Sequence, residues 1–483
     1  MHRSYGRFTF TVVMLTAATL TAGAAETPPA DPIKRVEQGL LPAQVIKGQP
    51  VRKTTLSDEM QRLKVPGVSV AVIHAGKIAW VKGYGVTVAG GAAVTPSTLF
   101  QAASISKPVT AMAALQMAQA GLLDLDKPAG AYLTSWKFPD SPASQTVTLR
   151  GLLSHTAGIS VSGFPGYARG RPIPSVVQVL DGAAPATTAP VRVTSTPGDA
   201  WRYSGGGYTV LQQLMSDVAG KPFEVLMAER VLRPLGMSNS YFEQPASARI
   251  LGAAAMPHDG AGKPIAGGPF SYPELAAAGM WSTPTDLAKF ALSIQAASLA
   301  RKGQVLNAAM VGAMLTPVKN GYGLGLEIAG EAGGRTFAHG GSNKGYQNSM
   351  VAYSDRGDGA VVMTNGEGGA DLARAVIRSV AAEYNWPTYR TVERAAVSLP
   401  GAALKATAGT YAIKGLGDFE ITEQAGELTF WKKAGQGERL YAQSPTEFFV
   451  LSQQLELRFD QAGGDEGRLV AGPFDVRFKR TGK

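Results

Sequence analysis

The sequence predicts a mixed α/β domain, with a mostly antiparallel sheet flanked by helices and interrupted by a helical insertion, followed by a small all-β domain. Strand-like apolar runs occur early and again late in the region before Pro387, while helical patterns fill the middle. Beyond Pro387 only short alternating runs remain. Sheet segments at both ends of a helical stretch indicate one mixed sheet, and alternating runs without helical periodicity indicate a barrel or sandwich.

The composition is that of an ordinary globular chain of 483 residues, 45% of them hydrophobic and 17% charged. The absence of cysteine excludes a disulfide scaffold, a zinc ribbon and thiol catalysis. The five histidines are too scattered to suggest a metal-binding helix, so a metalloenzyme is not expected. The 46 Lys and Arg residues are interleaved with 36 acidic residues and form no run, so no nucleic-acid partner is expected.

Residues 1–24 predict a secretory signal peptide. Arg3 and Arg7 precede an apolar run from Phe8 to Leu20, which ends in small residues. This run is shorter than the roughly 18 apolar residues of a membrane-spanning helix, and no later segment supplies that many uninterrupted apolar residues. We therefore expect a periplasmic or secreted mature protein without membrane insertion, whose exact cleavage site stays open.

The first elements of the main domain are a hairpin and a buried helix. Val68 to Ile73 and Ile78 to Val81 flank a short turn and predict antiparallel strands. Val109 to Ala120 is apolar nearly all round, which predicts a buried helix. Pro108 fits the first helical turn, where a missing N–H costs nothing, so the helix should begin close to Ser104.

The remaining elements complete two domains, residues 25–387 and residues 388–483. Proline-containing stretches at 183–190 and 195–198 predict surface loops. Helical patterns return at 208–219, at 223–232 and after Pro284, and strand-like runs at 322–328, 349–353 and 360–364. In the second domain the alternating runs fall at 419–421, 428–431, 448–451 and 455–459.

The sharpest chemical feature is Ser104 with Lys107 at the start of the apolar helix. Residues three apart share a helix face, so the hydroxyl and the amine can approach hydrogen-bonding distance. A serine hydroxyl needs a neighbouring base to become a nucleophile, and burial would lower the pKa of the lysine towards neutrality. Ser104 and Lys107 form the only Ser-x-x-Lys pair in the chain.

Two glycine-rich stretches are further candidates. Tyr203 precedes glycines 205–207 at the start of a helix, and a phenol near a lysine can act as phenolate and move protons. His339 precedes glycines 340–341, which allow close approach of a substrate. An edge strand in this second stretch could offer a backbone N–H to an oxyanion.

In chain order these three motifs resemble the active-site motifs of the serine β-lactamase and penicillin-binding protein superfamily. The likeness is greatest to its class C-like branch, which includes carboxylesterases, D,D-carboxypeptidases and D-aminopeptidases. Stretches at 65–68, 152–159 and 281–287 also resemble this branch, and the resemblance runs from Leu56 to Ala382. It implies a β-lactamase/transpeptidase-like fold without a cofactor. The last domain resembles the lipocalin-like or barrel domains attached to some exported members.

The resemblance also implies roles for individual residues. Ser104 would be the acylated nucleophile, Lys107 its proton acceptor, Tyr203 a second acid or base, and His339 the residue of the third motif. The backbone N–H groups of Ser104 and Ser342 would form the oxyanion hole. The glycines expected to contact substrate are Gly205, Gly340 and Gly341. His155, in the stretch at 152–159, is interpreted as a structural histidine near the cleft.

The sequence departs from the family pattern at two positions. Gly205 stands where the second motif commonly has Asn, which removes an amide that would bind a substrate amide. His339 stands where β-lactamases usually have Lys, so a fixed positive charge for a substrate carboxylate is absent near neutral pH unless the imidazole is protonated. Both departures favour an esterase or peptidase over efficient β-lactam hydrolysis.

The sequence thus predicts an exported serine hydrolase that acts through a Ser104 acyl-enzyme on a small-molecule or peptide substrate: an ester, an amide or a D-amino-acid peptide. The alternatives are a true class C-like β-lactamase and a non-catalytic protein that binds peptidoglycan or a partner. The oligomeric state stays open.

Overall fold

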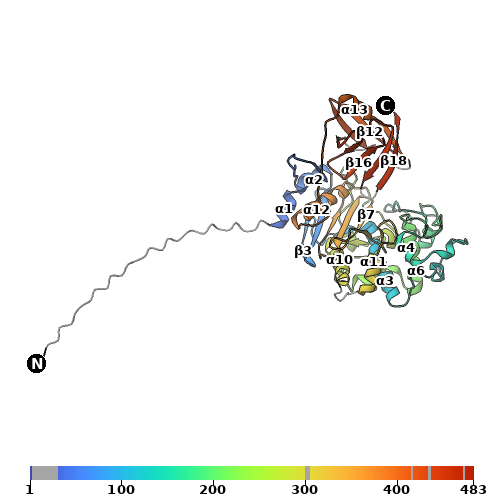
Figure 1. Cartoon of the computed structure of the whole chain (residues 1–483). Helices are drawn as coiled ribbons and strands as arrows, with labels where there is room; N and C mark the ends of the chain where they lie inside the picture. Colours follow the sequence, from blue (N-terminus) through green and yellow to red (C-terminus); the bar gives the residue numbers. More distant parts are fainter. Residues whose placement is uncertain (3–30, 300–304, 415–416, 433–436, 472–473, 483) are drawn as a thin grey trace.

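A computed structural model describes residues 1–2, 31–299, 305–414, 417–432, 437–471 and 474–482 (Figure 1). Apart from its first two residues, the predicted signal peptide lies outside the described residues. Within the described ranges, no helix combines the length and the apolar character needed to cross a membrane.

The main domain is built on a six-stranded sheet in the order β3-β2-β9-β8-β7-β6, in which every pair of neighbours is antiparallel. Early strands therefore pair with late ones, which confirms the predicted mixed α/β fold. In this order the strands are β3 (Lys77–Gly85), β2 (Gly67–His74), β9 (Gly359–Thr364), β8 (Tyr346–Tyr353), β7 (Thr336–Asn343) and β6 (Glu327–Ala329). Of the run expected as a strand over 322–328, only the last two residues belong to a strand, β6, because glycines 321, 323 and 325 interrupt the part before it.

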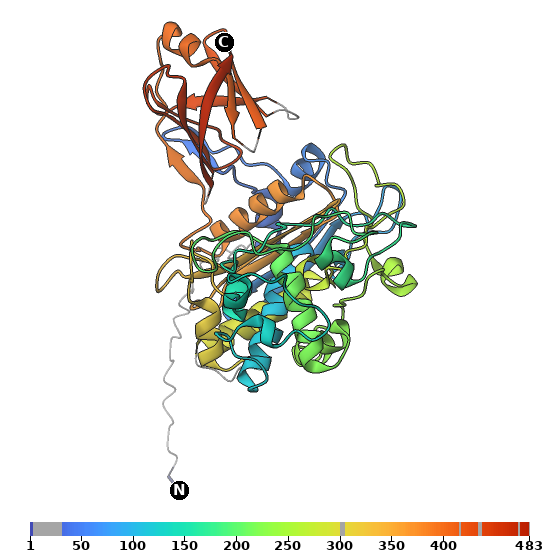
Figure 2. The same cartoon turned by 90° about the vertical axis from the view of Figure 1, so that its right-hand side faces the viewer.

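The two faces of the sheet bury separate cores, as the pleat of β2 shows. Its Val68, Val70 and Val72 pack with α12 (Gly369–Glu383) on one face, while Ala71 and Ile73 join the core on the other face. Figure 2 shows α12 on the side of the sheet that faces the barrel. Full burial of each valine contributes about 1.5–3 kcal/mol, so both faces stabilise the sheet.

The helical insertion packs beneath the other face of the sheet (Figure 2). Its central helices are the apolar α3 (Ser106–Gln119) and α6 (Gly205–Ala219). Two short helices, α4 (Leu149–Ser154) and α5 (Val176–Asp181), precede the stretches predicted as loops and were not predicted from the sequence. The remaining helices and strands are η1 (Ala103–Ile105), η2 (Ala129–Ala131), η3 (Ser144–Thr146), α7 (Phe223–Met227), the π-helix η4 (Ala228–Leu232), α8 (Ala248–Ala253), α9 (Leu275–Ala278), α10 (Pro284–Ser298), α11 (Ala308–Leu315), β4 (Phe100–Gln101) and β5 (Trp281–Ser282).

The last eight strands close into a barrel, which confirms the predicted all-β domain. Aromatic rings of Tyr411, Phe419, Phe459 and Phe478 fill its interior, with centroids 5.1–5.6 Å apart. The strands are β11 (Gly409–Ile413), β12 (Gly417–Gln424), β13 (Glu427–Lys432), β14 (Glu438–Ala442), β15 (Glu447–Phe449), β16 (Leu455–Phe459), β17 (Glu466–Ala471) and β18 (Phe474–Gly482).

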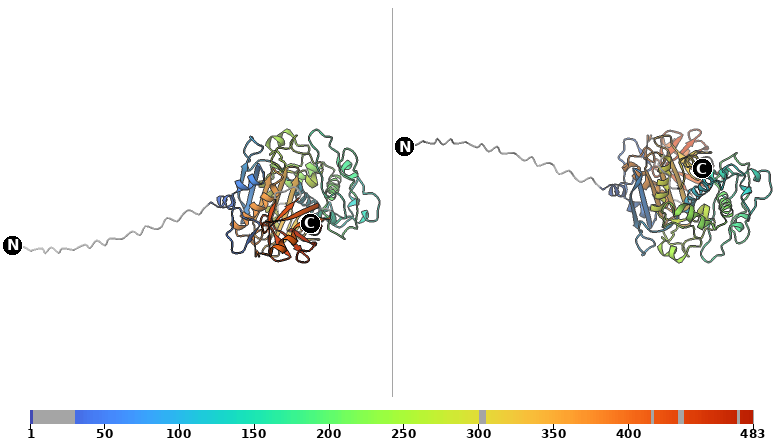
Figure 3. Two further views of the ribbon diagram at one scale, coloured as in Figure 1. Left: turned by 90° about the horizontal axis from the view of Figure 1, so that it is seen from above. Right: turned by 90° about the horizontal axis from the view of Figure 1, so that it is seen from below.

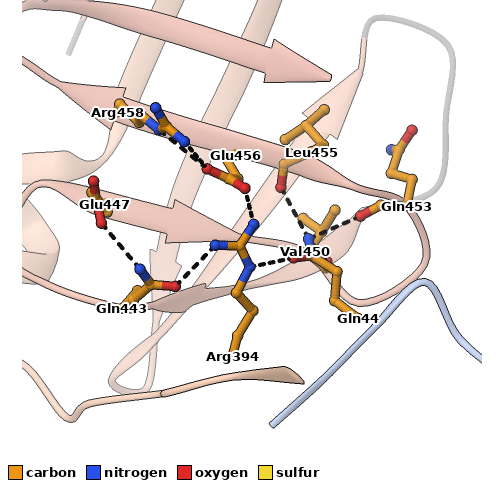
Figure 4. Close-up of polar contacts among 9 residues, drawn as sticks. All are labelled: Gln44, Arg394, Gln443, Glu447, Val450, Gln453, Leu455, Glu456 and Arg458. Atoms are coloured by element: carbon orange, nitrogen blue, oxygen red, sulfur yellow. Dashed lines mark hydrogen bonds and ion pairs between the residues drawn. The ribbon is translucent and has the colours of Figure 1, made fainter. Parts of the chain in front are cut away.

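A connector joins the barrel to the start of the chain. In it, β1 (Gln44–Ile46) pairs in parallel with β10 (Val392–Arg394), while α1 (Pro32–Gln38), α2 (Leu56–Arg62) and α13 (Gly401–Thr407) flank the two strands along the chain. The Gln44 amide donates to the carbonyls of Val450 and Gln453 in the barrel, and its oxygen accepts from Arg394, which also pairs with Glu456 (Figure 4). The barrel lies over the sheet rather than over the outer loops of the insertion (Figure 3).

Candidate active site

Ser104 lies in a strained turn immediately before α3. The preceding Ala103 has a φ of +53°, in the left-handed region that residues with a side chain rarely adopt. The Ser106 hydroxyl holds this turn by donating to Ala103 O at 2.6 Å and accepting from Met280 N at 3.0 Å. Strain that is fixed in this way is typical of functional sites. The bonds of Ser106 therefore fix where the Ser104 hydroxyl points.

Lys107 is buried beside Ser104, with only 2% of its surface exposed. Its Nζ lies 3.1 Å from Ser104 Oγ and 2.7 Å from the carbonyl oxygen of Ala277 in α9. Burial lowers the pKa of Lys107 from 10.5 to about 7. Because a large fraction of the amine is neutral near pH 7, Lys107 can accept the proton of the Ser104 hydroxyl.

Tyr203 completes a three-residue cluster with Ser104 and Lys107. Ser104 is near enough to the Tyr203 hydroxyl to lower the pKa of that group, and Lys107 Nζ lies 4.9 Å from the centre of the Tyr203 ring. Burial outweighs this effect and raises the pKa of Tyr203 above its usual range. The resting side chain is therefore a neutral phenol, and the phenolate considered from the sequence is disfavoured.

His339 lies in the buried part of β7 and is uncharged. Its Nδ1 donates to Gly340 O at 2.6 Å, while Nε2 lies 3.1 Å from the hydroxyl of Tyr322 and accepts from it. Burial, together with the smaller effect of the nearby Lys107, lowers the pKa of His339 to about 3. The imidazole therefore supplies no fixed positive charge to a substrate near neutral pH.

His155 packs among aromatic rings under the site. It ends α4 with a φ of +61°, and its Nδ1 accepts a hydrogen bond of 3.1 Å from Ser204 N, next to Tyr203. Its ring centre lies 4.4 Å from that of Tyr203 and 4.8 Å from that of Tyr322. Burial lowers the pKa of His155 well below its ordinary value. A neutral ring that positions Tyr203 agrees with the structural role expected for it.

Strand β7 passes close to the segment that carries Ser104, and the Ser342 N–H is free of the β7–β8 ladder. In the two-residue hairpin between β7 and β8, Asn343 pairs with Tyr346 and Ser342 with Gln347. The alternation of an antiparallel ladder then directs the N–H of Ser342 away from β8. An ideal Cβ on Gly341 would lie 2.2 Å from Ala102 O, so only glycine lets β7 pass this close to the segment that carries Ser104.

The other predicted glycines take different positions. Gly340 is exposed on β7, and a Cβ added there would have one neighbour within 4 Å, Asn348 O at 3.8 Å. Gly205 is the first residue of α6, and the ring of Phe164 fills the space beside it. In the part of the chain that the structure describes, no three His, Asp or Glu side chains gather as metal ligands would.

Sequence reasoning missed several residues of the site. Tyr322 and the Ala277 carbonyl contact His339 and Lys107, and Phe164 lies beside Gly205. Tyr322 comes from a glycine-rich turn, and a backbone carbonyl leaves no trace in a sequence. Phe164 lies outside the stretches that the sequence predicted as loops, and no local pattern marked it.

A family model described as Beta-lactamase matches residues 53–385 of the chain. The chain belongs to the β-lactamase family. The matched range holds Ser104, Lys107, Tyr203 and His339.

Individual relatives are distant. Protein flp of Staphylococcus aureus is 25% identical over 195 residues, which are 40% of this chain and 38% of that protein, so the chain spans less than half the length of the curated relatives it matches. The octameric penicillin-binding protein homologue of Pyrococcus abyssi is 22% identical with a TM-score of 0.60, covering 88% of this chain and 98% of that one. The D-amino acid amidase of Ochrobactrum anthropi is 22% identical with a TM-score of 0.54, covering 68% and 97%. These structures share the fold.

Proposed function

We propose that the protein is an exported hydrolase that forms an acyl-enzyme on Ser104 with an ester, an amide or a D-amino-acid peptide. The observation that carries the proposal is the buried Lys107 amine, 3.1 Å from Ser104 Oγ, with a pKa lowered to about 7. Such an amine is a base matched to neutral pH, and it has a nucleophile within reach.

The proposed reaction has two steps. In the first, Lys107 takes the proton as Ser104 Oγ bonds to the substrate carbonyl carbon, and the N–H groups of Ser104 and Ser342 stabilise the oxyanion. The bond to the leaving alcohol or amine then breaks, and the proton passes to that group from Lys107 or through the Tyr203 phenol. In the second step water attacks the acyl-serine, which releases the acid and restores the Ser104 hydroxyl.

A specific observation separates this function from that of a true β-lactamase. The neutral His339 offers no charge to the carboxylate that a β-lactam carries, and Gly205 offers no side-chain amide. We therefore rank an ester or a D-amino-acid amide above a β-lactam as substrate.

The test is turnover of three substrates: a p-nitrophenyl ester, a D-alanyl amide and a chromogenic cephalosporin. Ser104→Ala should abolish turnover, a loss of several powers of ten, while Ser97→Ala removes an exposed hydroxyl seven residues earlier and should keep it. Turnover that survives Ser104→Ala would contradict the proposal. The non-catalytic binding protein would instead bind these ligands without releasing product.

A further inference from the structure

The segment from Ser160 to Gly166 is tied to the first turn of α6, next to Tyr203. Three hydrogen bonds make the connection: Ser204 Oγ to Ser160 O at 2.9 Å, Gly206 N to Val161 O at 2.9 Å and Gly205 N to Ser162 O at 3.1 Å. Val161 has a φ of +63°, which is a marked outlier for a β-branched residue. The hydrogen bonds hold this strained conformation, as at sites where geometry serves a function.

The segment places the ring of Phe164 against Gly205. An ideal Cβ on Gly205 would lie 2.8 Å from Phe164 Cε2 and 3.3 Å from its Cδ2, closer than ordinary contacts. The ring therefore occupies the space that a side chain at position 205 would fill. Phe164 is itself only half-buried, so part of the ring remains accessible.

The Phe164 ring contacts the chain two residues beyond Tyr203. Gly205 follows Tyr203 by two residues, so their Cα atoms are no more than ~7 Å apart, and the Tyr203 ring centre lies 4.9 Å from Lys107 Nζ. A substrate that has its carbonyl carbon at Ser104 and extends past Tyr203 along this segment would meet the Phe164 ring.

The same segment reaches the strand that carries Ser342. A Cβ on Gly166 would lie 2.5 Å from Tyr272 Cζ, so the Tyr272 ring packs directly on that glycine. The Tyr272 hydroxyl accepts from the backbone N of Lys344, at the tip of the β7–β8 hairpin, at 3.1 Å. The segment thus connects α6 with the hairpin. Phe164 packs against Gly205 of α6, and Tyr272 packs against Gly166 and bonds to the hairpin.

We propose that Phe164 is a specificity-determining residue, whose ring forms an apolar wall for an uncharged apolar substituent next to the scissile carbonyl. The inference rests on the hydrolase function proposed above and adds the class of substrate. An aromatic wall gains from contact with an alkyl or aryl group, whereas an amide or a charged group there loses water without finding a partner. The wall therefore selects acyl or alcohol groups with an alkyl chain.

The experiment measures how fast alkyl fluorophosphonates label Ser104 as their alkyl chain lengthens from ethyl to octyl. In the wild type the rate constant should rise with chain length. Phe164→Ala should reduce the octyl-to-ethyl ratio about tenfold, the lower end of the discrimination that apolar contacts give. Two ester series, one with varied acyl groups and one with varied alcohols, show which side of the carbonyl faces the ring.

A matched pair of glycine substitutions controls for effects on the fold. Gly205→Ala adds a methyl group that must displace the Phe164 ring and should also change the ratio. Gly163→Ala adds the same methyl group in the same segment, where nothing lies within 4 Å, and should leave the ratio unchanged. The midpoint of thermal unfolding checks that each variant is folded.

The outcomes separate the two proposals. If Ser104 is labelled but the chain-length ratio is equal in the wild type and in folded Phe164→Ala, the wall is refuted and the hydrolase function stands. If no fluorophosphonate labels Ser104 in the wild type, the hydrolase function fails and the wall fails with it.

Discussion

Replacing Lys107 with methionine should remove activity and yet stabilise the protein. The folded state lowers the pKa of Lys107 from 10.5 to about 7, so the unfolded chain binds more protons than the folded chain between about pH 7 and pH 10.5. This penalty is complete below pH 7 and disappears as the pH rises to 10.5. It amounts to about 4 kcal/mol at pH 7 and about 2 kcal/mol at pH 9. Losing the contacts with Ser104 and Ala277 costs roughly 2 kcal/mol, so Lys107→Met should gain about 2 kcal/mol at pH 7.

The assay is urea unfolding of the wild type and of Lys107→Met at pH 7 and pH 9. The variant's advantage in free energy of unfolding should shrink by about 2 kcal/mol between the two pH values, because only the wild type carries the titrating amine. Lys77→Met, at an exposed lysine that starts β3, should keep the wild-type pH dependence. An advantage that is equal at both pH values would show that Lys107 is charged in the folded protein, and would refute its role as a neutral base.

Three further predictions follow from the site and the connector. Ala103→Gly relieves the left-handed backbone before Ser104 and should raise the free energy of unfolding by about 1 kcal/mol in urea titrations, and no gain would mean that the turn is unstrained. Gln44→Ala removes the donor that joins the connector to barrel carbonyls, so it should lower the free energy of unfolding by about 1–3 kcal/mol in calorimetry and leave ester turnover unchanged. Equal stability of the variant and the wild type would show that these hydrogen bonds contribute nothing. Because His339 is neutral, kcat/KM for a cephalosporin should be at least about tenfold below that for an uncharged ester, and equal values would contradict the absence of a carboxylate-binding charge.

Local patterns were enough to predict the elements that position Ser104. The apolar runs of β2 and β3 around a short turn gave the hairpin, and the all-round apolar α3 gave a buried helix. The spacing of Ser104 and Lys107 predicted their proximity, which the distance of 3.1 Å shows.

The rest of the site depends on tertiary contacts that no local pattern carries. Strand β7 is rich in glycine and polar residues, and it is extended because it pairs with β8 and packs against Ala102. Tyr322 and Phe164 reach the site from turns whose course depends on strained or glycine backbone. The charge of His339 was left open by the sequence, since it depends on burial, and the structure makes the imidazole neutral.

The most direct measurement is the rate at which a fluorophosphonate labels Ser104 as a function of pH, with the modified peptide identified by mass spectrometry. A neutral Lys107 that activates the serine predicts a rate that falls about tenfold per unit below pH 7 and levels off above it, with an apparent pKa near 7. Labelling at another residue, or a rate at Ser104 that does not change between pH 5 and pH 9, would contradict the account.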